Sequence, residues 1–203
     1  LSLTTGSLNN TAAGQILSPQ LQLTANHLIN RGLIDGQAVR LDAGTLDNLG
    51  SGRIYGDDLS IAAATLNNLP ENGTAPVVAA RRRLDLGVGN FNNRDGALLF
   101  SAGDMAIGGS LDASGRATGL AQAIDNASAT IEALGTLSIN TANLTNRRTR
   151  LEMMRVPGSP ENLSALERLD FVPDLRFHWP YEKDNRLWGV IVGARYINVI
   201  DKL

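Results

Sequence analysis

A short motif recurs along residues 1–146 and constrains the fold more than any other feature of the sequence. It reads apolar-x-apolar-x4-apolar-x-Asn, and it occurs six times in full. The full copies begin at Leu1, Leu21, Val39, Leu59, Leu84 and Leu137, and the first five begin 18 to 25 residues apart. Self-similarity at such a period predicts windings whose equivalent residues stack on one another.

The spacing inside the motif predicts strands rather than helices. Apolar residues at i and i+2 lie on one face of a strand, whereas an amphipathic helix needs spacings of three and four. A second short strand is predicted after the asparagine, where Gly-x-apolar recurs, as in Gly32 and Ile34. Together these features predict an all-β, right-handed parallel β-helix. A β-sandwich is the alternative, although a sandwich needs no fixed period.

The motif ends in asparagine in every full copy, at Asn10, Asn30, Asn48, Asn68, Asn93 and Asn146. Asparagine carries both a hydrogen-bond donor and an acceptor, and stacked strands lie about 4.8 Å apart. These residues are therefore expected to form a structural ladder of bonded side chains. The alternative is that they are surface turn formers, because asparagine tolerates a left-handed backbone.

Two stretches, residues 70–83 and 112–130, interrupt the period and are expected to be insertions. The centre of the second, residues 118–127, is rich in alanine and predicts a short helix outside the coil. A degraded copy before it has Met105, Ile107 and Leu111 but lacks the asparagine. Insertions in solenoids map to surface loops, often near a binding face. Alternatively, they are surface loops that the coil tolerates and that have no role in binding.

The sequence of residues 1–146 resembles the haemagglutinin repeats of filamentous haemagglutinins. The stretches that carry the resemblance are LQLTANHLINRGLIDG, LDAGTLDNLGSGRIYGDDLSIAAATLNN and GTLSINTANLTNR. This family consists of large exoproteins exported by two-partner secretion and includes the stalks of contact-dependent growth-inhibition proteins. The resemblance implies a β-helix on the surface of a Gram-negative bacterium. It also implies a role as adhesin or receptor-binding segment, with no catalysis in the repeat.

Residues 147–203 carry no repeat but hold six of the nine aromatic residues. We expect a non-repeating element here, with a helix over 160–169 and two short strands over 189–200. Trp, Tyr and Arg are enriched at binding hot spots. The partner-binding candidates are therefore Arg147, Arg148, Arg150, Trp179, Tyr181 and Trp188. The alternative is that the aromatic residues pack as a small core that caps the coil.

The composition excludes several kinds of site. The chain has no cysteine and two histidines, which rules out a disulfide scaffold, a thiolate metal site and a three-histidine zinc site. A net charge of −2 argues against a nucleic-acid partner. We predict no catalytic, cofactor-binding or metal-binding residue and no cofactor, and we expect a protein that is not an enzyme. The sequence begins directly on the motif, which predicts a segment of a longer chain.

Three functions remain open at this stage. The first is recognition of an outer-membrane protein, a surface glycan or a host-cell receptor by a monomeric segment, which meets a two-partner-secretion transporter during export. The second is a purely structural spacer. The third is a β-helical carbohydrate-active enzyme, which needs carboxylates that converge on one face. The candidates for the third, Asp57, Asp58, Asp85 and Asp104, are scattered among the copies.

Overall fold

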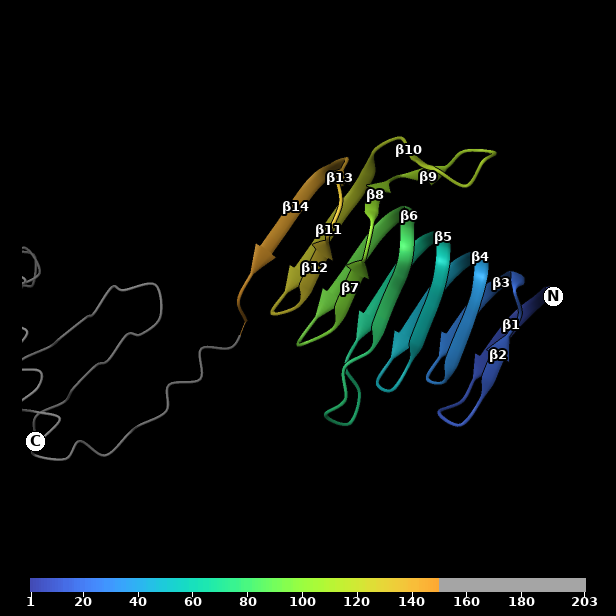
Figure 1. Ribbon diagram of the computed structural model, residues 1–203. Coiled ribbons are helices and arrows are strands. Elements are labelled where there is room, and N and C mark those ends of the chain that lie inside the picture. The colour runs from blue at the N-terminus through green and yellow to red at the C-terminus, as the bar shows by residue number, and fades with distance from the viewer. Residues whose placement is uncertain (150–203) are drawn as a thin grey trace, which may run out of the picture. The chain divides into compact units, whose positions relative to one another are not determined.

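The computed structural model describes residues 1–149, in which every regular element is a β-strand (Figure 1). The strands are β1 (Ser2–Asn10), β2 (Gln15–Leu17), β3 (Gln20–Asn30), β4 (Leu33–Leu49), β5 (Arg53–Leu69), β6 (Val77–Arg94), β7 (Leu98–Ser101), β8 (Asp104–Gly108), β9 (Ser110–Leu111), β10 (Ala117–Thr118), β11 (Ala121–Ala127), β12 (Thr130–Ala133), β13 (Leu137–Ile139) and β14 (Thr141–Arg147). The main sheet follows the order β1-β3-β4-β5-β6-β11-β14 with parallel pairing throughout. The predicted all-β parallel solenoid is confirmed.

The register of the strands places equivalent motif residues on top of one another. The first column contains Leu3, Leu23, Leu41, Ile61, Leu86, Ile107 and Ile139, one residue from each of about seven turns. The second contains Leu8, Leu28, Leu46, Leu66, Phe91, Ile124 and Leu144. The third contains Ile16, Ile34, Ile54, Val78, Leu99 and Ile131. One turn alone cannot bury its apolar face, so each turn depends on its neighbours.

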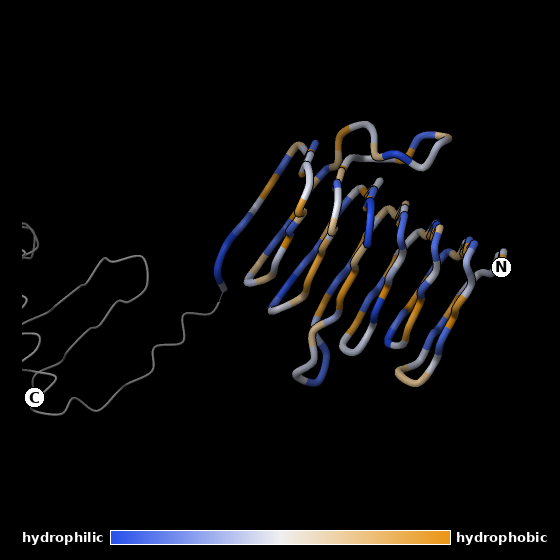
Figure 2. Tube along the Cα trace, viewed as in Figure 1, coloured by the Kyte–Doolittle hydropathy of each residue, from blue (hydrophilic) through white to orange (hydrophobic). Residues whose placement is uncertain are grey.

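The three columns form a narrow aliphatic core inside the coil. In the central turns these side chains are completely buried, whereas the residues between them face outward, and Figure 2 shows the resulting alternation of orange and blue. Phe91 is the single aromatic residue in the buried core of residues 1–149. A lumen of this width accepts Leu, Ile and Val. This explains why the repeat region contains few aromatic residues.

Asparagine side chains form a continuous ladder within the coil. In each turn the Nδ2 atom donates to the Oδ1 atom of the asparagine in the next turn, at 2.8–2.9 Å. The ladder runs through Asn10, Asn30, Asn48, Asn68, Asn93, Asn126 and Asn146. From Asn10 to Asn93, Nδ2 also donates to a backbone carbonyl of a later strand, such as Val77 for Asn48. The four central amides from Asn30 to Asn93 are fully buried yet hydrogen-bonded.

The glycine that follows the asparagine is required by close packing at the corner. A Cβ atom at Gly52 would lie 2.3 Å from Oδ1 of Asn48 and 2.5 Å from the carbonyl oxygen of Asn30. No side chain fits there without displacing the ladder. The same contact with the ladder occurs at Gly14, whereas Gly96 is favoured by its φ angle of 87°.

The first interruption is smaller than residues 70–83. Residues 70–76 form a loop that is closed by a bridge between Glu71 and Thr74, and Asn72 and Gly73 at its tip have φ angles of 51° and 75°. The coil resumes at Val77. One further residue is accommodated as a bulge in β6, where the register against β5 shifts between Gly56 and Asp58.

The short helix predicted for residues 118–127 is wrong, because β11 occupies Ala121–Ala127 and pairs with β6 and β14. Ile124 stacks between Phe91 and Leu144, and Asn126 continues the ladder. Helix propensity of alanine is a weak preference that tertiary stacking overrides. The inserted residues are instead 109–120, and they divide one copy of the motif into two parts.

The other predictions for the C-terminal region concern residues 150–203, which lie outside the described part. These are the helix over 160–169, the strands over 189–200 and the candidates Arg150, Trp179, Tyr181 and Trp188. Within residues 1–149 there is no helix with the length and hydropathy needed to cross a membrane.

Candidate binding surface

The β9–β10 hairpin leaves the coil after β8 and lies against the outer face of β6 and β5 (Figure 1). Its close approach depends on glycine. A Cβ atom at Gly87 would lie 2.3 Å from the backbone carbon of Ser110 and 2.5 Å from the nitrogen of Leu111. At Gly108 it would lie 2.6 Å from the carbonyl oxygen of Thr118. The hairpin therefore packs backbone to backbone on the coil.

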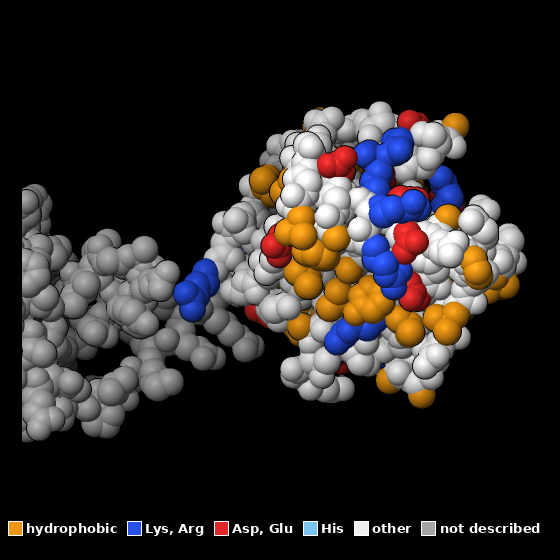
Figure 3. All heavy atoms as spheres, viewed as in Figure 1, with side chains coloured by type: hydrophobic (Ala, Val, Ile, Leu, Met, Phe, Trp, Pro, Cys, Tyr) orange, Lys and Arg blue, Asp and Glu red, His pale blue; other side chains and the backbone are white. Residues whose placement is uncertain are grey.

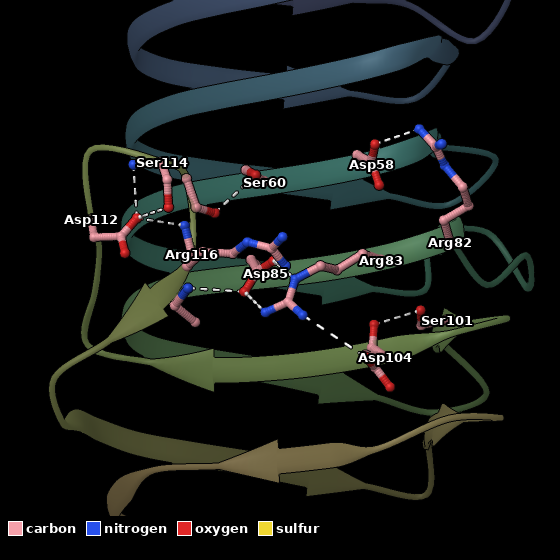
Figure 4. Close-up of polar contacts among 12 residues, drawn as sticks. Asp58, Ser60, Arg82, Arg83, Asp85, Ser101, Asp104, Asp112, Ser114 and Arg116 are labelled. Atoms are coloured by element: carbon pink, nitrogen blue, oxygen red, sulfur yellow. Dashed lines mark hydrogen bonds and ion pairs between the residues drawn. The ribbon is translucent and has the colours of Figure 1, made fainter.

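Asp85 on β6 anchors the hairpin, and its side chain is 4% exposed. Its carboxylate accepts two hydrogen bonds from the Arg83 guanidinium, at 2.6 and 3.1 Å, and one from the backbone N–H of Ala117 at 2.9 Å (Figure 4). Arg116 of the hairpin lies 3.9 Å from the same carboxylate. Bidentate, charge-assisted bonds of this kind are among the stronger polar contacts in proteins. Arg83 thus holds the carboxylate in place, and the bond from Ala117 and the ion pair with Arg116 join the hairpin to the fifth turn.

The tip of the hairpin is shaped by Asp112. Its Oδ1 atom accepts hydrogen bonds from the backbone N–H groups of Ser114 and Arg116, at 2.8 and 2.9 Å. Such side-chain-to-backbone bonds stabilise tight turns. Gly115, with a φ angle of 79°, is buried against β5, where the Ser60 hydroxyl donates to its carbonyl oxygen at 3.0 Å. The hairpin is thus attached at its base and at its tip.

Replacement of Asp85 by alanine is expected to release the hairpin while leaving the coil folded. The loss of a nearly buried carboxylate leaves Arg83 and the Ala117 N–H without their acceptor, at a cost of about 1–3 kcal/mol. Trypsin should then cut after Arg116 much faster than in the unmodified chain. Asp58→Ala is the matched control, because Asp58 is half exposed and pairs only with Arg82 among the described residues. Equal cleavage of the two variants would contradict the anchoring role.

A groove of about 580 Å³ lies between the hairpin and the outer face of the coil. The hairpin contributes Gly109, Ser110 and Leu111, and β3 to β6 contribute Thr24, Ala25, Asn26, Arg40, Asp42, Ala43, Gly44, Ala62, Ala63, Ala64, Gly87 and Gly89. Arg40 and Asp42 form a bidentate ion pair at 2.9 and 3.0 Å. Nine of the groove's 15 lining residues are glycine or alanine, and the polar ones are Thr24, Asn26, Arg40, Asp42 and Ser110.

Three consecutive arginines lie at the bulge of β6, and the first two bind acidic side chains of earlier turns. Arg81 donates to Asp35 at 3.1 and 3.2 Å and to Asp57 at 3.2 Å, so it joins three turns. These hydrogen bonds, that to Asp35 first, raise the pKa of the Arg81 guanidinium above its usual value. Arg82 pairs with Asp58, and Arg83 with Asp85. Figure 3 shows basic side chains in a band with acidic ones beside them, so this face carries paired rather than unopposed charge.

The carboxylates considered for a carbohydrate-active enzyme are all in contact with arginine. Asp57, Asp58 and Asp85 make the ion pairs described above, and Asp104 lies 4.0 Å from Arg83. Asp104 also accepts a hydrogen bond from the backbone N–H of Thr136 at 2.8 Å. Among residues 1–149 there is no group of three acidic or histidine side chains suited to a metal ion.

The predicted partner-binding residues are only partly within the described region. Arg147, at the end of β14, donates to Asp125 at 2.8 Å, and Arg94 binds the same carboxylate oxygen. Arg148 follows β14 and is exposed. The hairpin groove was not predicted. The pair Gly108–Gly109, followed within ten residues by Gly115, was the signal available for it.

The loop of residues 70–76 is held against the coil by another bidentate pair. Arg31 donates to Glu71 at 2.6 and 2.9 Å, and this contact lowers the pKa of the Glu71 carboxyl. The ion pair should therefore stabilise the loop fully at pH values above the ordinary glutamate pKa of about 4.3. The contribution should be lost as pH falls through the lowered folded-state pKa. The Glu71 and Thr74 amides bond across the loop at 3.0 and 3.1 Å, so their protection factors, corrected for the intrinsic pH dependence of exchange, should fall on acidification. Glu71→Gln should abolish that fall. An unchanged acid response in the variant would contradict the assignment.

No family model matches the chain, and no solved structure matches it. Among curated proteins it is similar to Deoxyribonuclease CdiA of Dickeya dadantii (strain 3937), at 33% identity over 118 residues. The match covers 49% of this chain and 3% of that protein. The chain thus spans a small part of the relative's length. The similarity and the β-solenoid fit the contact-dependent inhibition and haemagglutinin-repeat family that the sequence resembles.

This comparison corrects one prediction. The protein was expected not to be an enzyme, because the repeat lacks a recognisable catalytic set. The relative, however, is named as a deoxyribonuclease. The repeat pattern describes a scaffold, and a scaffold of this kind does not determine the activity of the protein that contains it.

Proposed function

We propose that the chain is a stalk segment of a secreted exoprotein of the contact-dependent growth-inhibition type, which recognises a partner on a cell surface without covalent chemistry. The observation that carries the proposal is the uninterrupted asparagine ladder over about seven turns. The sequence comparison also supports the proposal, because 118 residues of the chain are aligned with a CdiA protein at 33% identity. In this proposal the exoprotein lies on the surface of a Gram-negative bacterium and is exported by a two-partner-secretion transporter.

The coil is suited to act as a rod. Each turn hydrogen-bonds to its neighbours along whole strands, and ion pairs such as Arg81–Asp35 cross several turns. The two interruptions of the repeat are accommodated outside the core, so the columns continue past them. A solenoid with surface insertions can therefore present binding elements without loss of its own packing.

Residues 147–203 are proposed to contain a recognition element. The arginines and aromatic residues named above supply the residue types that dominate binding hot spots. The partner is an outer-membrane protein, a surface glycan or a host-cell receptor. Recognition by such side chains needs neither a cofactor nor a metal ion.

The test is binding of the fluorescently labelled 203-residue chain to bacterial and cultured host cells. A triple variant, Trp179→Ala, Tyr181→Ala and Trp188→Ala, should bind at least about tenfold more weakly, since hot-spot residues each contribute 2 kcal/mol or more. Tyr55→Ala, on the outer face of β5, is the matched aromatic control. If the unmodified chain binds no cell, the proposal fails. If the triple variant binds normally, the role of residues 147–203 is wrong.

The name of the relative favours a second candidate, in which the protein that contains this segment cleaves DNA. Incubation of the 203-residue chain with supercoiled plasmid and a divalent cation tests this candidate. Nicking would place the activity within the chain. Intact plasmid would show that the chain alone does not cleave DNA.

A further inference from the structure

We propose that the groove beneath the β9–β10 hairpin binds an uncharged glycan. One wall of the groove is held in place, because Gly87, Gly108 and the buried carboxylate of Asp85 fix the hairpin that forms it. Its volume of about 580 Å³ falls within the range of ligand sites in proteins. Its lining residues come from four successive turns, so it accommodates an extended chain rather than a compact molecule.

The charges that line the groove cancel. Arg40 and Asp42 are the two charged residues of its lining, and they neutralise each other through two hydrogen bonds. Attraction of a sulfated, phosphorylated or otherwise anionic polymer requires an excess of positive charge. A groove without net charge selects for a ligand without net charge.

The polar groups of the groove match hydroxyl groups. The side chains of Thr24 and Asn26 line the groove and make no side-chain hydrogen bond to other described residues. Each offers a donor and an acceptor, as a sugar hydroxyl does. The carboxylate of Asp42 retains lone pairs beyond those bound by Arg40. Alanines line the same groove and offer a small apolar surface on which the C–H face of a sugar ring can pack.

A protein partner is less well matched. Protein hot spots are centred on Trp, Tyr or Arg within apolar pockets. The groove contains no aromatic residue, and Leu111 is its only large apolar one. Small polar and small apolar groups spread over four turns favour many weak contacts with a hydroxylated chain.

The experiment measures binding of the 203-residue chain to neutral oligosaccharides of hexoses and N-acetylhexosamines by calorimetry, with sulfated and uronic-acid analogues in parallel. Two variants address the groove. Ala64→Trp fills it from an exposed lining position, and the double variant Thr24→Val with Asn26→Ala removes a hydroxyl and an amide from its lining. Ala13→Trp and Asn9→Ala are matched controls, because both positions are exposed and neither lines the groove.

We expect a neutral oligosaccharide to bind the unmodified chain and both controls equally. Ala64→Trp should abolish binding, and the double variant should weaken it about tenfold, as the loss of two hydrogen bonds predicts. The inference is overturned if no neutral glycan binds, if charged analogues bind better, if an unrelated peptide competes, or if Ala64→Trp binds normally.

The biological meaning of the groove depends on the proposed function, and the two can fail separately. Cell binding by the same set of variants distinguishes them. If the unmodified chain binds cells but no glycan in calorimetry, the glycan-binding proposal is wrong and the proposed surface role stands. If the chain binds glycan in calorimetry but binds no cell, the proposed surface role is wrong and glycan binding in the groove stands.

Discussion

Replacement of Asn68 by alanine is expected to lower the free energy of unfolding by about 3–5 kcal/mol. Asn68 is fully buried, accepts a hydrogen bond from Asn48 at 2.9 Å, and donates to Asn93 at 2.9 Å and to the Leu98 carbonyl at 3.2 Å. Alanine breaks the ladder and leaves partners on both sides unsatisfied within the core. Each unsatisfied buried polar group costs about 1–3 kcal/mol.

The neighbouring residue supplies the control. Asn67 points outward, is half-buried, and bonds to Asp47 at 2.7 Å and to Asn92 at 2.8 Å. Water can replace these partners when Asn67 becomes alanine, so a loss of about 1 kcal/mol or less is expected. Urea unfolding of both variants, followed by circular dichroism, measures the difference. Equal losses for Asn67→Ala and Asn68→Ala would show that the ladder is not inside the coil.

The second large effect is expected at Phe91, which is completely buried and stacks between Leu66 and Ile124. Phe91→Ala should cost about 3–5 kcal/mol, because it removes apolar contacts and leaves a cavity that the rigid coil cannot close. Phe91→Leu introduces the residue type found at the equivalent position of the preceding turn, and it should lower the free energy of unfolding by less than about 1.5 kcal/mol. Thermal and urea unfolding distinguish the two. A small loss for Phe91→Ala would mean that this column is not a packed core.

The coil could be predicted from the sequence because its cause is local and repeated. Leu23, Leu41 and Ile61 lie at the same place in successive copies, and stacking of equal residues is the arrangement that buries them all. The helix predicted for residues 118–127 was wrong because the hairpin divides a copy of the motif and separates Met105 from its asparagine. The usable signal was the pair Ile124 and Asn126, which precedes the equivalent pair in β14 by 20 residues.

The groove could not be predicted in the same way. Thr24, Arg40 and Ser110 are far apart in sequence, and they line one cavity only because the hairpin folds back over earlier turns. The repeat pattern specifies which residues face inward, but it contains no information on where an insertion packs. Residue type alone indicates the partner-binding candidates and does not show which of them are already paired; Arg147 donates a hydrogen bond to Asp125 on the coil.

Disulfide cross-linking tests most directly whether the windings stack in register, because the chain has no cysteine of its own. Thr45 is the register partner of Thr65, and Thr65 of Asn90. Neighbouring strands lie about 4.8 Å apart, within reach of a disulfide, whereas strands two turns apart lie about twice as far apart. Cysteine pairs at 45/65 and 65/90 should oxidise to an intramolecular disulfide, and the pair at 45/90 should not. Cross-linking of 45/90 with no cross-linking of the other two would contradict the stacked coil.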